Sequence, residues 1–536
     1  MSAAPADGAT ATHPPARTRR PLLIALGVVA AAGCAWWLAA RLIPKGLPAG
    51  IVLLGVMLGS ITALSAMGLV LVHRATGIVN FAQAALGAAA ATLAFELATV
   101  SGWSYLPAVA AALLFAALLG AAVDRLVVRR FAAAPRFVLT LATIGVAQVL
   151  GAVDLLLPEV FGDTRFALAG GLRPPVSVRI EVAPVLFNGA HVTAVAAVPL
   201  AMAALAWFLL GTGAGRAVRA AADNEERARL MGIPVRLLST LVWSSAGVLA
   251  ALAAVLALPL QGQARGVSGD PSVLLPALAA AVVAGMTSLP RAALAGIALG
   301  VAQQAIFWAT SRGGLINVGY LVVILAALLL DRRKAPTARA AAGSAWTWPG
   351  VGEAAPLPAA VTRQPAVRLA RAGLILAVAV AAAAAPAVAD TRQLNLLGSV
   401  TAVYALVAVS LVVLTGWAGQ ISLGQFAVAG VGAVVAANLL AKAGADLFVA
   451  LLAASAAGAA TAVILGLPAL RTRGLFFAVT TLAFAAAMAS YFLNPTYFSG
   501  LLPEVIHRPV LFGRVDLTDE RNLYWFCAAV VAVAVA

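Results

Sequence analysis

Charged residues are scarce in this 536-residue chain: Asp, Glu, Lys and Arg together make up 10%, whereas 63% of the residues are hydrophobic. Soluble domains are typically about 25% charged and about 45–50% apolar, so this composition excludes a water-soluble globular protein and a disordered one. The mean hydropathy of +1.01 requires surroundings that solvate apolar surface. A lipid bilayer is such an environment.

Cysteine and histidine are also rare. Cys34 and Cys527 are far apart, each in an apolar run, which indicates neither a disulfide framework nor a cysteine metal site. The four histidines are scattered, and no His-Glu-x-x-His or G-x-x-x-x-G-K-[ST] motif occurs. The sequence therefore predicts no metal, no cofactor and no catalytic constellation in this chain, and it is interpreted as a non-enzyme.

Long apolar runs are abundant, and several approach the roughly 20 residues that a helix needs to cross a bilayer. Strands of a membrane barrel would alternate apolar and polar residues, which these runs do not. We expect an all-α polytopic membrane protein. The predicted spans are 21–40, 50–72, 78–99, 106–123, 137–157, 191–211, 240–260, 273–288, 291–310, 316–330, 372–389, 396–415, 419–440, 447–467, 475–493 and 523–536.

The net charge of +16 is distributed by topology. With the amino terminus inside, the segments predicted to face the cytoplasm hold 23 of the 35 Lys and Arg residues. This asymmetry follows the positive-inside rule. No basic patch is interleaved with stacking aromatics, so nucleic acid is not an expected partner. The prediction is a multi-pass protein of the cell inner membrane with a cytoplasmic amino terminus.

The first apolar run follows three arginines, as a secretory signal does. It continues through Trp36 and Trp37 to Arg41 without a clear cleavage site, which favours an uncleaved anchor. Residues 1–49 are therefore predicted to be a cytoplasmic tail and an extra anchor helix. Residues 331–371, rich in Ala, Pro and Arg, are predicted to be a flexible cytoplasmic linker.

The segments on the two sides of this linker resemble each other. At an offset of 342, Gly77 aligns with Gly419 and Gln83 with Gln425, and at an offset of 338, Thr143 aligns with Thr481. Two similar halves of the same orientation predict two homologous helical bundles in a parallel pseudo-twofold arrangement. A passage between the halves is a natural route for a solute.

Polar residues recur at the corresponding place in each half. Asn80 and Gln83 lie three residues apart in the first half, as do Ser422 and Gln425 in the second. On a helix each pair would share one face. Such residues either form hydrogen bonds between helices, which is the commoner case, or line a pathway.

The most informative loop is 216–239. Its charged residues lie on an Ala-rich helical pattern that stops at Gly232 and Pro234. We expect a short helix parallel to the membrane that presents a charged face to the cytoplasm, although composition alone would also fit a solvated connector. The residues assigned to this face are Asp223, Glu225, Glu226, Arg227, Arg229 and Gly232.

This loop, with Ala220 to Ala222 followed by Gly232, resembles the coupling loop of ABC importer permeases. The segment GLVLVHRATGIVNFAQAALG resembles the H-type subunit of branched-chain amino acid importers, and LTGWAGQISLGQFAVAGVGAVVAANL with RTRGLFFAVTTLAF resembles the M-type subunit. The expected domains are an H-type permease domain over 50–330 and an M-type permease domain over 372–536. The M-type half is expected to be incomplete, because it ends in an apolar run before a second coupling loop.

The resemblance implies a permease that moves branched-chain or related amino acids inward by alternating access. It implies two separate ATPase subunits at the cytoplasmic face, where ATP would bind, and a soluble solute-binding protein at the outer face. The residues alone leave open a secondary transporter driven by an ion gradient, because such transporters place ionisable groups within the membrane.

Overall fold

The structure is a computed structural model that describes most of the chain. The described residues are 41, 45–131, 134, 136–162, 172, 174–261, 271–330, 364–388, 391–469, 475–503, 508, 510–511 and 515–536. The predicted anchor span 21–40 and residues 331–363 of the predicted linker lie outside these ranges.

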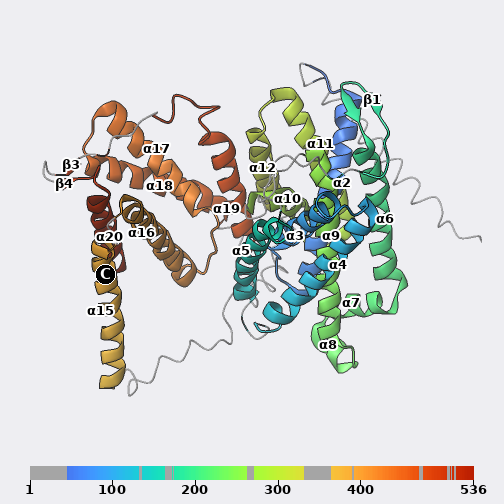
Figure 1. Cartoon of the computed structure of the whole chain (residues 1–536), viewed down its shortest axis with the longest axis horizontal. Helices are drawn as coiled ribbons and strands as arrows, with labels where there is room; N and C mark the ends of the chain where they lie inside the picture. The colour runs from blue at the N-terminus through green and yellow to red at the C-terminus, as the bar shows by residue number, and fades with distance from the viewer. Residues whose placement is uncertain are drawn as a thin grey trace, which may run out of the picture.

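Residues 45–330, which we name the H-type half after the sequence they resemble, consist of helices with a longer loop between α5 and α6 (Figure 1). In chain order they are α2 (Ala49–Thr76), α3 (Gln83–Thr99), α4 (Tyr105–Val123), the π-helical turn η1 (Asp124–Val128), α5 (Arg136–Val160), α6 (Gly189–Gly211), α7 (Gly213–Asp223), α8 (Glu225–Leu230), α9 (Val235–Gln261), the 3₁₀ turn η3 (Pro271–Leu274), α10 (Leu275–Val283), α11 (Leu289–Thr310) and α12 (Gly314–Leu330). A small hairpin of β1 (Ile180–Val182) and β2 (Val185–Phe187) precedes α6.

Residues 364–536, which we name the M-type half after the sequence they resemble, begin with α15 and then repeat the order of α2 to α6. Its elements are α15 (Pro365–Val388), α16 (Arg392–Val412), the π-helical turn η5 (Val413–Trp417), α17 (Gln425–Ala443), α18 (Leu447–Ala469), α19 (Leu475–Ala487), the π-helical turn η6 (Met488–Phe492), the hairpin of β3 (Val510–Leu511) and β4 (Val515–Asp516), and α20 (Glu520–Val535). Across the described residues, ten helices are long and apolar enough to span a membrane. The predicted all-α polytopic membrane fold is confirmed.

Several predicted boundaries were wrong. Helix α3 begins at Gln83 and α17 at Gln425, five or six residues after the predicted starts of their spans, because each is preceded by a non-helical segment. Helix α15 begins at Pro365, inside the predicted linker.

The predicted span 273–288 is a short buried helix. From Ser272 to Val283 it has 12 helical residues, which cover about 18 Å at 1.5 Å per residue, well short of the roughly 30 Å bilayer core. It packs against α2, α11 and α12, and Leu275 and the residues from Ala277 to Val282 are buried. A helix that ends within the membrane is tolerated when protein surrounds it.

Helices α2 and α11 form the most extensive helix–helix contact in the described part of the chain. Gly55 and Gly59 on α2 face Gly296 and Gly300 on α11, so that two glycine pairs spaced by four residues meet. A Cβ atom at Gly300 would lie 2.3 Å from the Cα atom of Gly59. Small residues at this spacing allow two backbones to approach closely, which is a main source of helix association in lipid.

Helix α9 runs through the centre of the H-type half and packs on α2, α3 and α4. The approach of α4 to α9 again depends on glycine, because a Cβ at Gly120 would lie 2.4 Å from the Trp243 carbonyl oxygen. Trp243 is fully buried at this crossing. Helix α9 therefore has a fixed position relative to α4.

The internal repeat is visible in matching backbone contacts. Gly77 and Gly419 both have a positive φ, near +71° and +62°, and each ends the helical segment before it. The Phe81 N–H donates to Thr143 Oγ1 over 3.1 Å, and the Leu423 N–H donates to Thr481 Oγ1 over 2.9 Å. The threonine that aligned in the sequence therefore captures the same backbone group in both halves.

The halves meet where α12 packs against α19 and η6. The Ser490 hydroxyl donates to the Gly314 carbonyl over 3.3 Å, and the Gly314 N–H donates to the Tyr497 hydroxyl over 3.4 Å. Val479 and Leu482 of α19 join the buried cluster around Ile324 of α12. Figure 1 shows α19 on the side of the M-type half that faces the H-type half.

We expect Gly300→Ala to destabilise the protein, because its new Cβ would overlap the α2 backbone. Overpacking of this kind typically costs about 1–3 kcal/mol. Gly145→Ala on α5 is the matched control, since open space surrounds its Cβ position and alanine favours a helix over glycine by about 1 kcal/mol. Thermal unfolding in detergent should show a lower midpoint for the first variant only. Equal midpoints would contradict the proposed contact.

Candidate functional site

The charged loop of the H-type half folds as an elbow of two helices, α7 and α8, followed by a tight turn. We call residues 213–234 the charged elbow. Its first helix starts where the Thr212 hydroxyl accepts the Gly215 N–H over 2.9 Å, an N-terminal cap. Helix α7 lies across the end of α6 (Figure 1).

Asn224 divides the elbow, where the sequence had predicted one continuous helix. Its backbone is extended, and its side-chain Oδ1 accepts the Arg227 N–H over 2.9 Å to cap α8. Asparagine is among the preferred capping residues because its side chain competes with the helical backbone. Asp223 is thus the last residue of α7, while Glu225 and Glu226 open α8, next to its positive end.

The turn after α8 is a Schellman motif. The Gly232 N–H donates to the Arg229 carbonyl and the Ile233 N–H to the Ala228 carbonyl, each over 3.0 Å. Gly232 has a φ of +77°, which glycine adopts without strain. The structure therefore explains the glycine that the sequence pattern singled out: it closes the helix and directs the chain into α9.

The elbow presents both charged and apolar side chains to its surroundings. The predicted residues Asp223, Glu225, Glu226, Arg227 and Arg229 are all exposed, and Arg229 pairs with Glu225 at 2.6 Å. An exposed pair of this kind contributes little stability.

Two apolar residues at the tip of the elbow were not among the predicted site residues. Leu230 is 84% exposed and Met231 is 80% exposed, side by side at the end of α8. Two adjacent exposed apolar residues between charged residues and a turn glycine are a signal that the sequence contains, in RARLMGIP. Such residues are suited to contact with another protein.

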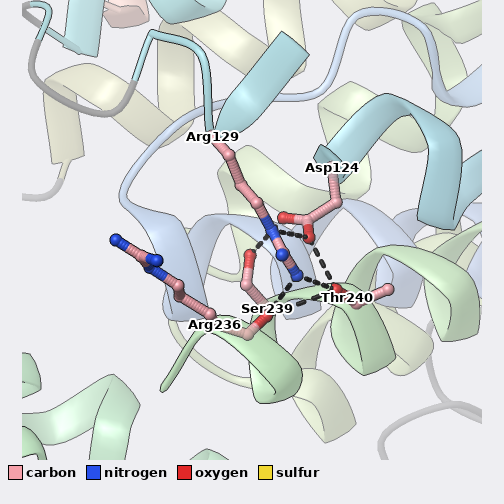
Figure 2. A network of polar contacts seen from close by, with 5 residues as sticks. All are labelled: Asp124, Arg129, Arg236, Ser239 and Thr240. Carbon is pink, nitrogen blue, oxygen red and sulfur yellow. Dashed lines mark hydrogen bonds and ion pairs between the residues drawn. The ribbon is translucent and has the colours of Figure 1, made fainter. Parts of the chain in front are cut away.

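A buried polar network holds the elbow's exit to the rest of the bundle (Figure 2). Asp124, fully buried in η1, forms an ion pair with Arg129 at 3.0 Å and accepts hydrogen bonds from Ser239 at 2.5 Å and Thr240 at 2.7 Å. Arg129 also donates to the Arg236 carbonyl over 2.9 Å. The first turn of α9, which follows the elbow directly, is therefore fastened to the end of α4.

Both carboxylate oxygens of Asp124 have hydrogen-bond donors. An isolated charge would be expensive to bury, whereas a guanidinium and two hydroxyl donors compensate Asp124. The cluster is not evident in the sequence because Asp124 and Thr240 lie more than one hundred positions apart. The local signal is an acid at the end of an apolar run.

The predicted amides of the first half lie in the core. Asn80 precedes α3 instead of lying on it, so the predicted shared helical face was wrong. Both side chains are fully buried: Asn80 Nδ2 donates to Gln83 Oε1 over 3.1 Å, and Gln83 Nε2 donates to the Ala246 carbonyl over 3.0 Å. Gln83 crosses to α9 beside Gly68, where a Cβ would clash with its amide. These contacts favour the role at a helix interface.

The corresponding pair in the M-type half has the same placement. Ser422 lies before the helix, where its hydroxyl accepts the Gly424 N–H over 3.2 Å, and Gln425 is the first residue of α17. Ser422 is buried and Gln425 partly buried. In this half too, the predicted shared helical face was wrong.

Two further acids lie inside the bundle. Glu96 on α3 and Asp154 on α5 are almost completely enclosed, and the Thr92 hydroxyl donates to Asp154. Both residues therefore lie among packed helices, away from the lipid-facing surface.

The apolar helices and the internal repeat define a polytopic membrane protein built from two similar halves. A family model described as "Branched-chain amino acid transport system / permease component" matches residues 51–330 and 394–536. The chain belongs to this family, and the match in two segments is consistent with two permease halves fused in one chain.

Individual relatives align with about half of the chain. The Escherichia coli K12 high-affinity branched-chain amino acid transport system permease protein LivH is 28% identical over 302 residues, covering 51% of this chain and 90% of its own length. BraD of Pseudomonas aeruginosa is 27% identical, covering 51% and 91%, and a probable LivH of Methanocaldococcus jannaschii is 26% identical, covering 54% and 93%.

We expect Asp124→Asn to lower stability by about 2 kcal/mol, because it removes the charge that compensates Arg129. Arg129→Gln should have an effect of similar size, and the double variant should lose less than the sum of the two. Glu225→Gln, which breaks the exposed pair at the elbow, is the control and should change little. Additive losses in thermal unfolding would show that the two residues act independently.

Proposed function

We propose that this chain is the transmembrane permease of an ABC importer that moves branched-chain or related amino acids into the cell. Its two halves open alternately to the two sides of the membrane. ATP is hydrolysed on two separate ATPase subunits at the cytoplasmic face, and this chain binds no cofactor itself. The observation that carries the proposal is the charged elbow with its exposed apolar tip, in a chain of the branched-chain amino acid permease family.

The elbow is suited to dock on an ATPase subunit. Leu230 and Met231 supply an apolar centre, and the charges of α8 surround it. Interfaces commonly have this anatomy, in which a few buried apolar anchors carry most of the binding energy inside a polar rim. The partner would provide a groove that covers the tip of α8.

Motion at the elbow can reach the membrane helices through a short rigid path. The Schellman turn connects α8 to α9, and the Asp124 network fastens the start of α9 to η1 and α4. Binding energy at the ATPase would thereby bias the equilibrium between inward-facing and outward-facing states. A flexible connection would dissipate this bias before it reached the helices.

The outer face would receive a soluble solute-binding protein. Each half carries a two-stranded hairpin in the long loop that precedes α6 or α20. These loops lie on the outer side if the amino terminus is cytoplasmic and the chain lies in the cell inner membrane, as the distribution of Lys and Arg predicts.

The substrate assignment rests on the family and on the names of the relatives. LivH and BraD are named as permeases of high-affinity branched-chain amino acid transport. Asn80 and Gln83 use their amides within the protein, which leaves few polar groups to hold a zwitterion tightly. Selectivity would therefore reside mainly in the binding protein.

A secondary transporter is the second candidate, because the enclosed carboxylates Glu96 and Asp154 are of the kind that couple transport to an ion gradient. The two functions separate in cells that express the complete transporter. Leucine uptake that stops on ATP depletion but survives an uncoupler supports the ABC importer. The opposite pattern supports ion coupling.

We expect the double variant Leu230→Gln, Met231→Gln to lose leucine uptake by roughly tenfold or more, because truncating a docking anchor typically costs about 2 kcal/mol. Membrane insertion should be unchanged, since both side chains are exposed. Leu230→Met with Met231→Leu keeps the apolar tip and is the matched control. Normal uptake by the glutamine variant would contradict docking at this tip.

The orientation predicts which residues a membrane-impermeant thiol reagent reaches. In a background with Cys34 and Cys527 replaced by Ser, a cysteine introduced by Leu186→Cys on the β1–β2 hairpin should react in intact cells. One introduced by Glu226→Cys on α8 should react after permeabilisation only. Both original side chains are exposed, so access alone decides the labelling. Labelling of the Glu226→Cys variant in intact cells would show that the predicted orientation in the membrane is wrong.

A further inference from the structure

A cavity of about 360 Å³ lies behind the charged elbow, between α2, α6, α7 and the start of α11. Its volume is in the range of about 300–1,000 Å³ that is typical of ligand sites. The residues that line it are Met67, Leu71, Arg74, Ala75, Met202, Leu205, Ala206, Leu209, Leu210, Val218, Arg219, Ala222, Thr287, Ser288, Leu289 and Pro290.

One part of the cavity is apolar and lies beside exposed apolar residues of α6. Met67 and Leu71 of α2 and Leu205 of α6 form its inner wall. Leu210, which also lines it, is 65% exposed, and the adjacent outward-facing Trp207 is 70% exposed. Helix α6 lies at the edge of the bundle (Figure 1). An acyl chain could therefore enter from the bilayer.

The other part is polar and positively charged. Arg74 at the end of α2 and Arg219 on α7 come from different helices, and neither has an ion-pair partner within the described part of the chain. Thr287 and Ser288 add hydroxyl groups at the amino end of the 22-residue helix α11, where the helix dipole attracts anions. No acidic side chain is among the lining residues.

We propose that this cavity binds an anionic phospholipid, with an acyl chain against α2 and α6 and the phosphate headgroup between Arg74 and Arg219. An amino acid substrate fits less well, because its ammonium group would find no carboxylate. If α7 faces the cytoplasm, as proposed above, the lipid comes from the inner leaflet. Basic pockets between helices on this side of a membrane are suited to anionic headgroups.

Bound lipid would connect the elbow to the membrane. Arg219, Val218 and Ala222 belong to α7, whereas Arg74 and Leu71 belong to α2, so that one molecule touches both. A headgroup shared by the two arginines would brace α7 against the bundle. The inner-leaflet lipid composition would thereby influence the stiffness of the elbow.

Binding is tested by native mass spectrometry of the purified full chain, titrated with dioleoyl phosphatidylglycerol or dioleoyl phosphatidylcholine. We expect phosphatidylglycerol to bind at least tenfold more tightly. Arg74→Gln with Arg219→Gln should remove this preference, since each basic residue contributes about a fivefold effect near an anionic lipid. Ala206→Phe should also weaken binding by filling the cavity while it keeps both charges.

The matched control is Arg125→Gln with Arg130→Gln, two exposed arginines, one in η1 and one just after it, that do not line the cavity. It should keep the preference. The proposal is overturned if this control loses the preference equally, if either cavity variant retains wild-type binding, or if leucine or inorganic phosphate displaces the lipid. Thermal unfolding confirms that each variant is folded. Because the readout needs neither ATPase nor uptake, its failure is distinguishable from a failure of the proposed transport function.

Discussion

Helices inside a bilayer cannot associate by excluding water, and this bundle therefore depends on close backbone contact at small residues. The facing glycines of α2 and α11, and the approach of α4 to α9 at Gly120, bring main chains nearer than any side chain would permit. These contacts fix α2 and α9, the two most enclosed long helices among those described. Helices α3, α4 and α6 pack on α9, and α10 packs on α2.

Polar groups in such a bundle are few, and the structure uses them at points where the chain changes direction. Thr143 and Thr481 each take up a backbone N–H that the loop before a helix would otherwise leave unpaired. In the core, Asn80 Oδ1 accepts the Ala82 N–H, Gln83 donates to the Ala246 carbonyl, and Asp124 joins η1 to α9. Because the bilayer core offers no water to unpaired polar groups, each of these hydrogen bonds stabilises the fold whether or not the residue contacts a solute.

The sequence was sufficient for the fold class, the repeat and the residues of the charged elbow, because each of these is written in composition or local pattern. It was insufficient where distant contacts decide. By hydropathy, the residues just before Gln83 look like part of a helix. They are not helical, and the Phe81 N–H among them bonds to the Thr143 hydroxyl. Likewise 273–288 has the length of a span, but its helix stops at Val283, and Met286 then turns the chain with a φ of +55°. The break at Asn224 needed knowledge of its side-chain hydrogen bond.

The π-helical turn at Asp124–Val128 has a geometric effect on everything after it. The Arg129 N–H bonds to the Asp124 carbonyl five residues earlier, which places one more residue in the turn than an α-helix holds. At 3.6 residues per turn, one residue corresponds to about 100° of rotation. An ordinary α-helical register would therefore swing the Arg129 side chain about a quarter of a circle away from its carboxylate. Deletion of one residue from this turn would therefore break the Asp124–Arg129 ion pair even though both side chains remained in the sequence.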